Sequence, residues 1–276
     1  MASQHRAQRS ERFQQLVEAG WEAFHDRRPR WLRAVLARMR GLEPEAPEVL
    51  DLQWRLAYVQ GDMDRALEVA QQGAALYPDD PDLLYATGWC LLELGAFEDA
   101  VVPLARACER EPTLADGWYD LAVAHEALGN PEATRVAFSR VHELDVSRLS
   151  AEPRLFTIED FEAIVAAALA ELPGDVQAAM TNLAVIVEDY PDPWIVEQPP
   201  YDPRLFGLFV GPTFADTRST HVATEEPTRI YVFQRNLERQ FRHPDWLRDE
   251  IRITLIHEVG HFLGLSEADL AQRGWL

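Results

Sequence analysis

The amino-acid sequence predicts two domains, an all-α solenoid of helical repeats followed by a small α+β domain. In the first half, glycine and proline each recur every 34 residues, at Gly61, Gly95 and Gly129 and at Pro44, Pro78 and Pro112. The helical periodicity is lost over residues 146–156, and Pro153 lies inside this stretch, which predicts a linker. After the linker, the sequence contains short β-branched runs, which predict strands, and two longer helical patterns. This combination predicts an α+β domain.

The composition is that of a folded globular protein. The chain has 276 residues, 47% of them apolar, so two domains are expected at about 100–200 residues each. No apolar run approaches the roughly 18 residues of a membrane helix. The first six residues are polar and no apolar segment follows them, so we expect no secretory signal and a cytoplasmic location. Cys90 and Cys108 are too few for a disulfide framework and are expected to be buried, reduced thiols.

The charge is strongly negative. The chain contains 26 basic residues, all of them Arg, and 46 acidic residues, for a net charge of −20. Residues 1–42 carry +5, so residues 43–276 carry −25. Because sequence-independent affinity for nucleic acid comes from basic residues that displace counterions, a nucleic-acid partner is not expected, and neither is a membrane partner.

The 34-residue period is typical of helix–turn–helix repeats. With Pro81 as the first position of the clearest repeat, small residues and proline fall at the expected places, namely Gly88, Ala100, Ala107 and Pro112. Residues 47–145 therefore resemble the tetratricopeptide family. Trp54 departs from the pattern because a small residue is usual at its position, and residues 13–46 are expected to form a degenerate pair of capping helices.

Such repeats stack into a superhelix with a concave surface. The resemblance implies that residues 1–145 bind a protein or peptide partner. The aromatic side chains of the repeats are expected to pack between helices rather than contact a ligand; they are Tyr85, Trp89, Trp118 and Tyr119.

The second domain, residues 157–276, should open with a helix. Thr157 is a suitable N-cap, and Pro173 and Gly174 end the helix near Leu172. Strands are expected at residues 183–187, 206–210 and 229–233, where the runs are apolar and largely β-branched or aromatic. A last helix should begin at Pro244 and extend to Leu263.

That last helix contains the HExxH arrangement, with His257, Glu258 and His261. Two histidines four residues apart lie on the same stripe of a helix, so both imidazoles can reach one ion. Glu258 lies beside them, where it can accept a proton without binding the metal. The pattern predicts a Zn²⁺ site with His257 and His261 as ligands and Glu258 as the catalytic base.

A third protein ligand is expected, since catalytic zinc sites usually have three. Gly264 can end the helix in a left-handed turn and return the chain toward the metal, which makes Glu267 the best placed carboxylate. Residues 257–266 resemble the core of the small bacterial zincin-like metallopeptidases, whose motif is HExxHxxGxxD. That resemblance implies an α+β zincin-like domain with the final acid as third ligand. Glu267 replaces the usual Asp, so Asp269 remains an alternative ligand.

The leading hypothesis is therefore a zinc-dependent peptidase whose tetratricopeptide domain recruits a protein substrate or partner. An extended substrate could add to an exposed strand edge, for which residues 229–233 are the candidate. His221 and Tyr231 are possible oxyanion donors, but we favour their interpretation as a polar turn residue and a sheet aromatic. The alternative hypothesis is a non-catalytic interaction scaffold whose zincin-like domain is inactive or only binds metal.

Overall fold

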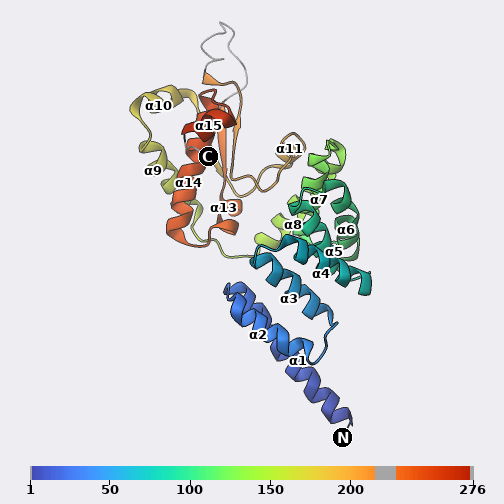
Figure 1. The fold of residues 1–276 in the computed structure, drawn as a ribbon. Helices are drawn as coiled ribbons and strands as arrows, with labels where there is room; N and C mark the ends of the chain where they lie inside the picture. Colours follow the sequence, from blue (N-terminus) through green and yellow to red (C-terminus); the bar gives the residue numbers. More distant parts are fainter. Residues whose placement is uncertain (1, 215–227, 274–276) are drawn as a thin grey trace. The chain divides into compact units, whose positions relative to one another are not determined.

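The structure is a computed structural model that describes residues 2–214 and 228–273 (Figure 1). It divides into two compact units, Met1–Val141 and His142–Leu276. No helix in the described ranges is long and apolar enough to cross a membrane.

The first unit consists of helices joined by short turns. They are α1 (Ala2–His25), α2 (Pro29–Arg40), α3 (Pro47–Val59), α4 (Met63–Leu76), α5 (Pro81–Glu93), α6 (Phe97–Arg110), α7 (Ala115–Ala127) and the first part of α8 (Pro131–Leu149), which continues past Val141 into the second unit. Consecutive helices from α1 to α7 pack against each other, and Tyr119 of α7 contacts Phe138 of α8. Figure 1 shows α3 to α7 stacked side by side. The expected N-terminal pair is present as α1 and α2, whose apolar side chains share a core with α3. The helical solenoid predicted for this half is confirmed.

The periodic glycines lie where the backbone needs them. Gly61, Gly95 and Gly129 follow α3, α5 and α7 with φ of +76°, +75° and +68°, the left-handed region that favours glycine. Gly88 serves a different purpose, because a Cβ there would lie 2.4 Å from Leu104 Cγ on α6. Helices α5 and α6 can therefore cross closely at Gly88 only because this residue lacks a side chain.

The aromatic side chains of the repeats pack largely against one another. Trp54, at the position that Gly88 has one repeat later, is buried and donates a hydrogen bond from Nε1 to Asp51 Oδ1 at 2.8 Å. Its ring lies 5.5 Å from that of Trp89. The bulky residue at this position is therefore accommodated by contacts within its own helix and with α5.

The second unit contains short helices and a small sheet. Its elements after α8 are α9 (Ile158–Ala170), α10 (Gly174–Ala179), the 3₁₀ turn η1 (Met180–Asn182), β1 (Ala184–Glu188), α11 (Pro193–Val196), β2 (Gly207–Val210), β3 (Arg229–Phe233), α13 (Gln234–Gln240), α14 (Pro244–Phe262) and α15 (Glu267–Arg273). Thr157 caps α9 as expected, since its Oγ1 accepts a hydrogen bond from the amide of Asp160 at 3.1 Å. Pro244 begins α14, also as expected.

The strands form a sheet in the order β1-β3-β2, with β1 parallel and β2 antiparallel to β3. Side chains alternate between its two faces. Ile230 and Val232 join the core formed with α9 and α14, whereas Tyr231 and Phe233 join a second cluster around Ile195 of α11. Helix α14 contacts both β2 and β3, so the sheet supports the helix that carries the HExxH sequence.

The central position of β3 overturns one expectation. Both of its edges are paired, so residues 229–233 cannot accept an added substrate strand as the sequence suggested. Three strand-length segments are recognisable in the sequence, but their order depends on pairing between distant residues. Within the described sheet, β1 and β2 are the two edge strands, one on each side of β3.

The region predicted as a linker begins with helix. Helix α8 continues to Leu149, so the first residues of the 146–156 stretch are helical, and the two compact units divide between Val141 and His142. Residues between α8 and α9 contain turns and bends.

Candidate metal centre

Helix α14 presents two imidazoles to the same point. The Nε2 atoms of His257 and His261 lie 3.0 Å apart, and both side chains are about one-quarter exposed. This arrangement follows from the four-residue spacing, which places both residues on one face of the helix. His261 Nδ1 also lies 3.2 Å from the carbonyl oxygen of Leu265. A hydrogen on Nδ1 can be donated to this carbonyl oxygen, which leaves the lone pair of Nε2 free to bind an ion.

The chain returns toward the histidines through a glycine turn. Gly264 has φ of +86°, and the amide of Leu265 donates to the carbonyl of Gly260 at 3.0 Å, which closes the end of α14. Helix α15 then begins at Glu267, whose Oε1 lies 3.5 Å from His257 Nε2 and 3.1 Å from His261 Nε2. The expected return of the chain at Gly264 is confirmed.

Asp269 lies outside this group. Its carboxylate accepts hydrogen bonds from the amide and the hydroxyl of Ser266, at 2.9 and 2.6 Å, and its own amide donates to Ser266 Oγ at 3.3 Å. This reciprocal pair caps the N-terminus of α15 and lowers the pKa of Asp269. Of the two carboxylates left open by the sequence, the structure brings Glu267 to the histidines.

The three side chains suit a transition metal such as zinc. One ligand atom from each of His257, His261 and Glu267 lies within 4.8 Å of the others. Because zinc lies about 2.0–2.2 Å from nitrogen and carboxylate ligands, one ion can contact two atoms up to about 4 Å apart, and all three observed separations meet this limit. Two imidazoles and one carboxylate are also a ligand set that zinc hydrolases use.

Glu258 faces the sheet beside these ligands. It is only 7% exposed, and its Oε2 accepts a hydrogen bond from the amide of Phe209 on β2 at 2.8 Å. Burial raises its pKa to about 7, with a further contribution from Glu267, while His261 and the Phe209 amide act in the opposite direction.

Gly207 makes room for Glu258. A Cβ at Gly207 would lie 2.8 Å from Thr254 Cγ2 and 2.9 Å from Glu258 Cγ, so β2 can approach α14 only because this residue lacks a side chain. The expected site residues included neither Gly207 nor Phe209. A glycine inside a predicted strand is a signal of close backbone approach and could have indicated the first of them.

Of the two possible oxyanion donors, the structure describes only Tyr231, which is not part of this group. His221 lies outside the described residues. Tyr231 is buried in the cluster on the sheet face that carries α11, where its hydroxyl accepts a hydrogen bond from Arg229 at 3.2 Å.

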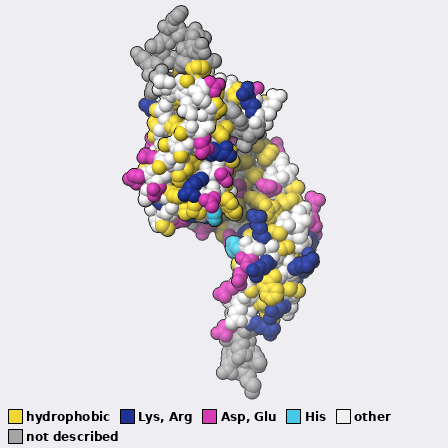
Figure 2. Space-filling view, turned by 90° about the vertical axis from the view of Figure 1, so that its left-hand side faces the viewer, with side chains coloured by type: hydrophobic (Ala, Val, Ile, Leu, Met, Phe, Trp, Pro, Cys, Tyr) yellow, Lys and Arg dark blue, Asp and Glu magenta, His cyan; other side chains and the backbone are white. Residues whose placement is uncertain are grey.

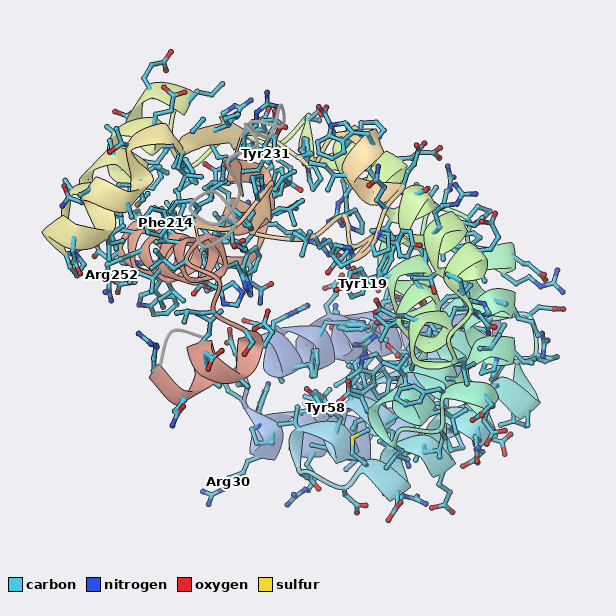
Figure 3. All side chains as sticks on the ribbon, turned by 90° about the horizontal axis from the view of Figure 1, so that it is seen from above. Arg30, Tyr58, Tyr119, Phe214, Tyr231 and Arg252 are labelled. Atoms are coloured by element: carbon cyan, nitrogen blue, oxygen red, sulfur yellow. The ribbon has the colours of Figure 1, made fainter. Side chains whose placement is uncertain are left out.

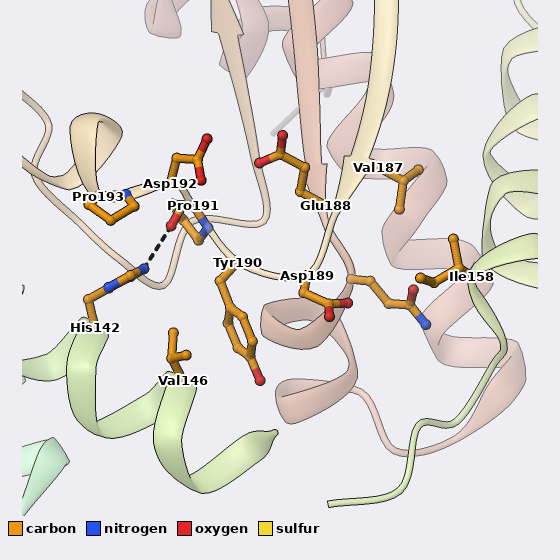
Figure 4. Close-up of a pocket in the computed structure, with 11 residues that line it drawn as sticks. His142, Val146, Ile158, Val187, Glu188, Asp189, Tyr190, Pro191, Asp192 and Pro193 are labelled. Carbon is orange, nitrogen blue, oxygen red and sulfur yellow. Dashed lines mark hydrogen bonds between the residues drawn. The ribbon is translucent and has the colours of Figure 1, made fainter. Parts of the chain in front are cut away.

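A separate pocket of about 470 Å³ lies at the end of β1 (Figure 4). His142 Nε2 contacts the carbonyl oxygen of Pro191 at 2.7 Å across it. Its wall includes Glu188, whose pKa is raised by burial and by Asp192. The residues that line it do not include the histidines or Glu258.

Comparison with known proteins agrees with this geometry. The family model for zincin-like metallopeptidases matches residues 180–275, which include β1, the sheet and the whole HExxH segment. The chain therefore carries a zincin-like metallopeptidase domain. A tetratricopeptide repeat model matches residues 57–107, upstream of the zincin-like domain. Tetratricopeptide arrays commonly mediate protein–protein interaction through their concave surfaces.

The chain is also similar to named proteins. Human tetratricopeptide repeat protein 7A is 31% identical over 107 residues, which is 39% of this chain and 12% of the human protein. Among solved structures, a MamA protein is 15% identical and covers 51% of this chain and 78% of its own, with a TM-score of 0.43. MamA from Desulfovibrio magneticus RS-1 is 20% identical over 50% of this chain and 78% of its own, also with a TM-score of 0.43.

Proposed function

We propose that the protein is a cytoplasmic zinc-dependent peptidase whose tetratricopeptide domain recruits a protein substrate or partner. The observation that carries the proposal is the convergence of His257, His261 and Glu267 beside the buried carboxylate of Glu258. The zincin-like domain supports the same chemistry. The unpaired thiols Cys90 and Cys108 are consistent with a reducing compartment.

In this proposal each side chain has a separate task. His257 and His261 would hold the metal through Nε2, and Glu267 would hold it through its carboxylate. When bound, zinc supplies Lewis-acid polarisation of a carbonyl and activation of water. The Phe209 amide holds Glu258 Oε2, so Oε1 is the oxygen that accepts a proton from the attacking water and returns it to the leaving amine.

The decisive experiment separates metal binding from proton transfer. Zinc content is measured by mass spectrometry on protein purified without added metal, and hydrolysis is measured on a peptide library with the zinc-loaded protein. We expect about one zinc per chain, lost in a variant with both His257→Ala and His261→Ala. Glu258→Gln should retain zinc and reduce hydrolysis by about a hundredfold or more.

Glu250→Gln is the matched control, because it removes a partly buried carboxylate from the same helix at a distance from the histidines. It should leave both zinc content and hydrolysis unchanged. Unchanged zinc content in the double histidine variant would refute the metal site. Equal hydrolysis by the wild type and Glu258→Gln would refute the assignment of the base.

One observation favours the alternative of a non-catalytic scaffold. The Glu267 side chain is 66% exposed, and water competes with the metal for an exposed carboxylate. A zinc-loaded protein that hydrolyses no peptide in the library, while still binding a partner through its repeats, would establish this alternative in place of the peptidase.

We also propose that residues 1–145 and 157–276 are separate domains joined by residues 146–156. The turns between α8 and α9 support a cleavable connection, although α8 itself extends to Leu149. Limited proteolysis should cut between residues 150 and 156 and leave two folded fragments. Resistance of this stretch, together with one cooperative unfolding transition for the whole chain, would refute the division.

A further inference from the structure

The pocket of about 470 Å³ at the end of β1 contains an unpaired hydrogen-bond acceptor in its wall. Gln234 lines the pocket and is fully buried, and its Oε1 has no hydrogen-bond partner among the residues that the structure describes. Every residue that lines the pocket belongs to the second unit. A buried polar atom without a partner costs free energy, so a ligand that donates a hydrogen bond to Oε1 would stabilise the site.

The neighbours of Gln234 determine which way its amide points. Its Nε2 donates to the carbonyl oxygen of Phe156 and to Glu238 Oε1, both at 2.8 Å. Exchange of the amide nitrogen and oxygen would place Oε1 against these two acceptors, so the amide orientation is settled. Glu238 is held in turn by Arg235, whose Nη1 donates to Oε2 at 3.0 Å. Gln234 Oε1 is therefore a fixed acceptor that the described residues leave unused.

Two carboxylates in the same wall lack a counter-charge. Glu188 ends β1 and Asp192 precedes α11, and neither carboxylate makes a hydrogen bond or ion pair with another described residue. Figure 4 shows the two carboxylates near each other, and the pKa of Glu188 is raised by burial and then by the charge of Asp192. Asp189 differs, because it is paired with Arg154 at 2.6 Å. A cation in the pocket would supply the charge that Glu188 and Asp192 lack.

The nitrogen donors of the wall are already engaged. His142 Nε2 lies 2.7 Å from the carbonyl oxygen of Pro191, and it must donate there because a carbonyl oxygen only accepts. The amide nitrogen of Gln234 also has its two acceptors. The apolar part of the wall consists of Val146, Ile158, Val187, Pro191 and Pro193. Free acceptors, negative charge and apolar surface suit a donor-rich cation with an apolar stem, and they do not suit an anion.

The spacing of these groups favours an organic cation over a metal ion. Among the described residues, the group of three or more His, Cys, Asp or Glu side chains that lie close enough to hold a metal is that of His257, His261 and Glu267. The acids of the pocket and His142 form no such group. Ammonium and guanidinium groups carry several N–H donors that point in different directions, so one such group can reach acceptors that are too far apart for a single metal ion.

The pocket lies beyond the carboxyl ends of two parallel strands, where ligands commonly bind in open sheets. Strand β1 ends at Glu188 and β3 at Phe233, and these two residues are paired. Glu188 shares its face of the sheet with Ile186 and Tyr231, whereas α14 packs on the other face; Figure 3 shows Tyr231 apart from Arg252 of α14. The pocket is thus separate from the metal centre on α14.

We propose that this pocket binds an organic cation, a guanidinium or primary ammonium group on an apolar stem, which donates hydrogen bonds to Gln234 Oε1 and to the carboxylates of Glu188 and Asp192. A free amine and a Lys or Arg side chain of a peptide both carry this group. The net charge of −20 attracts cations at long range. Arginine and acidic side chains are interspersed on the face drawn in Figure 2, so selection depends on a local site such as this pocket.

The test measures dissociation constants on the full chain by saturation-transfer NMR, with EDTA present so that zinc takes no part. The probes are n-butylguanidinium, n-butylammonium, butyltrimethylammonium, which keeps the charge but has no N–H, and n-butanol, which has no charge. We expect the first two to bind at least about tenfold more tightly than the last two. An acetylated Gly-Gly-Arg-Gly-Gly amide distinguishes the sources: binding tighter than that of butylguanidinium assigns the site to a peptide side chain, and weaker binding assigns it to a free amine.

Variants locate the site. Glu188→Gln should weaken binding of the two N–H cations by about five- to tenfold, because it removes one charged acceptor from a partly enclosed site. The control is Glu197→Gln, which removes an exposed acid directly after α11, outside the pocket wall, and changes the net charge equally. It should change the affinity less than about twofold. Circular dichroism checks that the variants fold; if Glu188→Gln does not, Asp192→Asn at an exposed residue repeats the test, with a smaller loss in the same direction.

Three outcomes would overturn the proposal. Binding of butyltrimethylammonium as tight as that of butylammonium would show that no N–H donor is recognised. Equal losses in Glu188→Gln and Glu197→Gln would mean general attraction by the net charge. Absence of binding by every probe at millimolar concentrations would leave ordered water as the partner of Gln234 Oε1. Zinc content and hydrolysis are measured separately, so failure here leaves the peptidase proposal standing, and absence of hydrolysis leaves this result standing.

Discussion

The close approach of β2 to α14 makes Gly207→Ala a direct test of how the site is held. The new Cβ would lie 2.8 Å from Thr254 Cγ2 and 2.9 Å from Glu258 Cγ, whereas unstrained carbon contacts lie at about 3.5–4.0 Å. Relief requires β2 and α14 to separate by roughly 0.6 Å or more, because both atoms are close to their own backbones. Thr254 and Glu258 are buried, so neither side chain can turn out into solvent without further cost.

The cost of this overpacking is about 1–3 kcal/mol. Separation of the two elements also lengthens the hydrogen bond from the Phe209 amide to Glu258, which is 2.8 Å in the structure. We therefore expect amide hydrogens of β2 and β3 that exchange through local opening to exchange roughly 5 to 150 times faster, since 1.4 kcal/mol corresponds to a factor of ten. Protection in the first unit should not change.

Hydrogen exchange with mass spectrometry checks this, with peptides that cover β2, β3 and the first unit. The control is Gly174→Ala at the start of α10, where an added Cβ meets nothing within 4 Å. Exchange in β2 and β3 that is the same in Gly207→Ala, Gly174→Ala and the wild type would refute the argument that Gly207 is required for the contact between β2 and α14.

Three further predictions follow from other parts of the molecule. Glu267→Ala should weaken zinc retention, measured by dialysis against a chelator. Asp269→Ala should lower the stability of α15 and leave zinc retention unchanged. Equal zinc loss in both variants would contradict the assignment of Glu267 as the third ligand. Burial raises the pKa of Cys90 and Cys108 to about 12, so both thiols should resist iodoacetamide until the chain unfolds. Above about pH 8.5 the unfolded thiols ionise and the folded ones do not, so the free energy of unfolding, measured in urea, should fall as pH rises; a flat profile would contradict this. Gly95→Ala should lower the free energy of unfolding, measured in denaturant, by about 1–2 kcal/mol, because φ at this residue is +75°. An added Cβ there meets nothing within 4 Å, so an unchanged free energy of unfolding would refute the argument from backbone strain.

Local chemistry explains which features could be recognised in the sequence. The cap at Thr157, the start of α14 at Pro244 and the left-handed turn at Gly264 each depend on residues within a few positions, and all three are present. The spacing of His257 and His261 also implies their shared helix face, since the helix period alone determines it.

The arrangement around Glu258 could not be recognised in the same way. Its hydrogen bond to Phe209 joins residues 49 positions apart, and its burial depends on the contact with Gly207. The sheet order is a similar case, because β3 lies between a parallel and an antiparallel neighbour, and this choice depends on which apolar faces meet in the folded state. The expected substrate edge at residues 229–233 was wrong for this reason.

By itself, the sequence determined the helical repeats, the short strands and the helix that carries the two histidines, because period, caps and turn residues act over short distances. Only the tertiary structure decided that Glu267 rather than Asp269 lies beside the histidines and that β3 is central. These features depend on contacts between segments that are remote in the chain, and such contacts form only when the apolar faces of several elements are buried together.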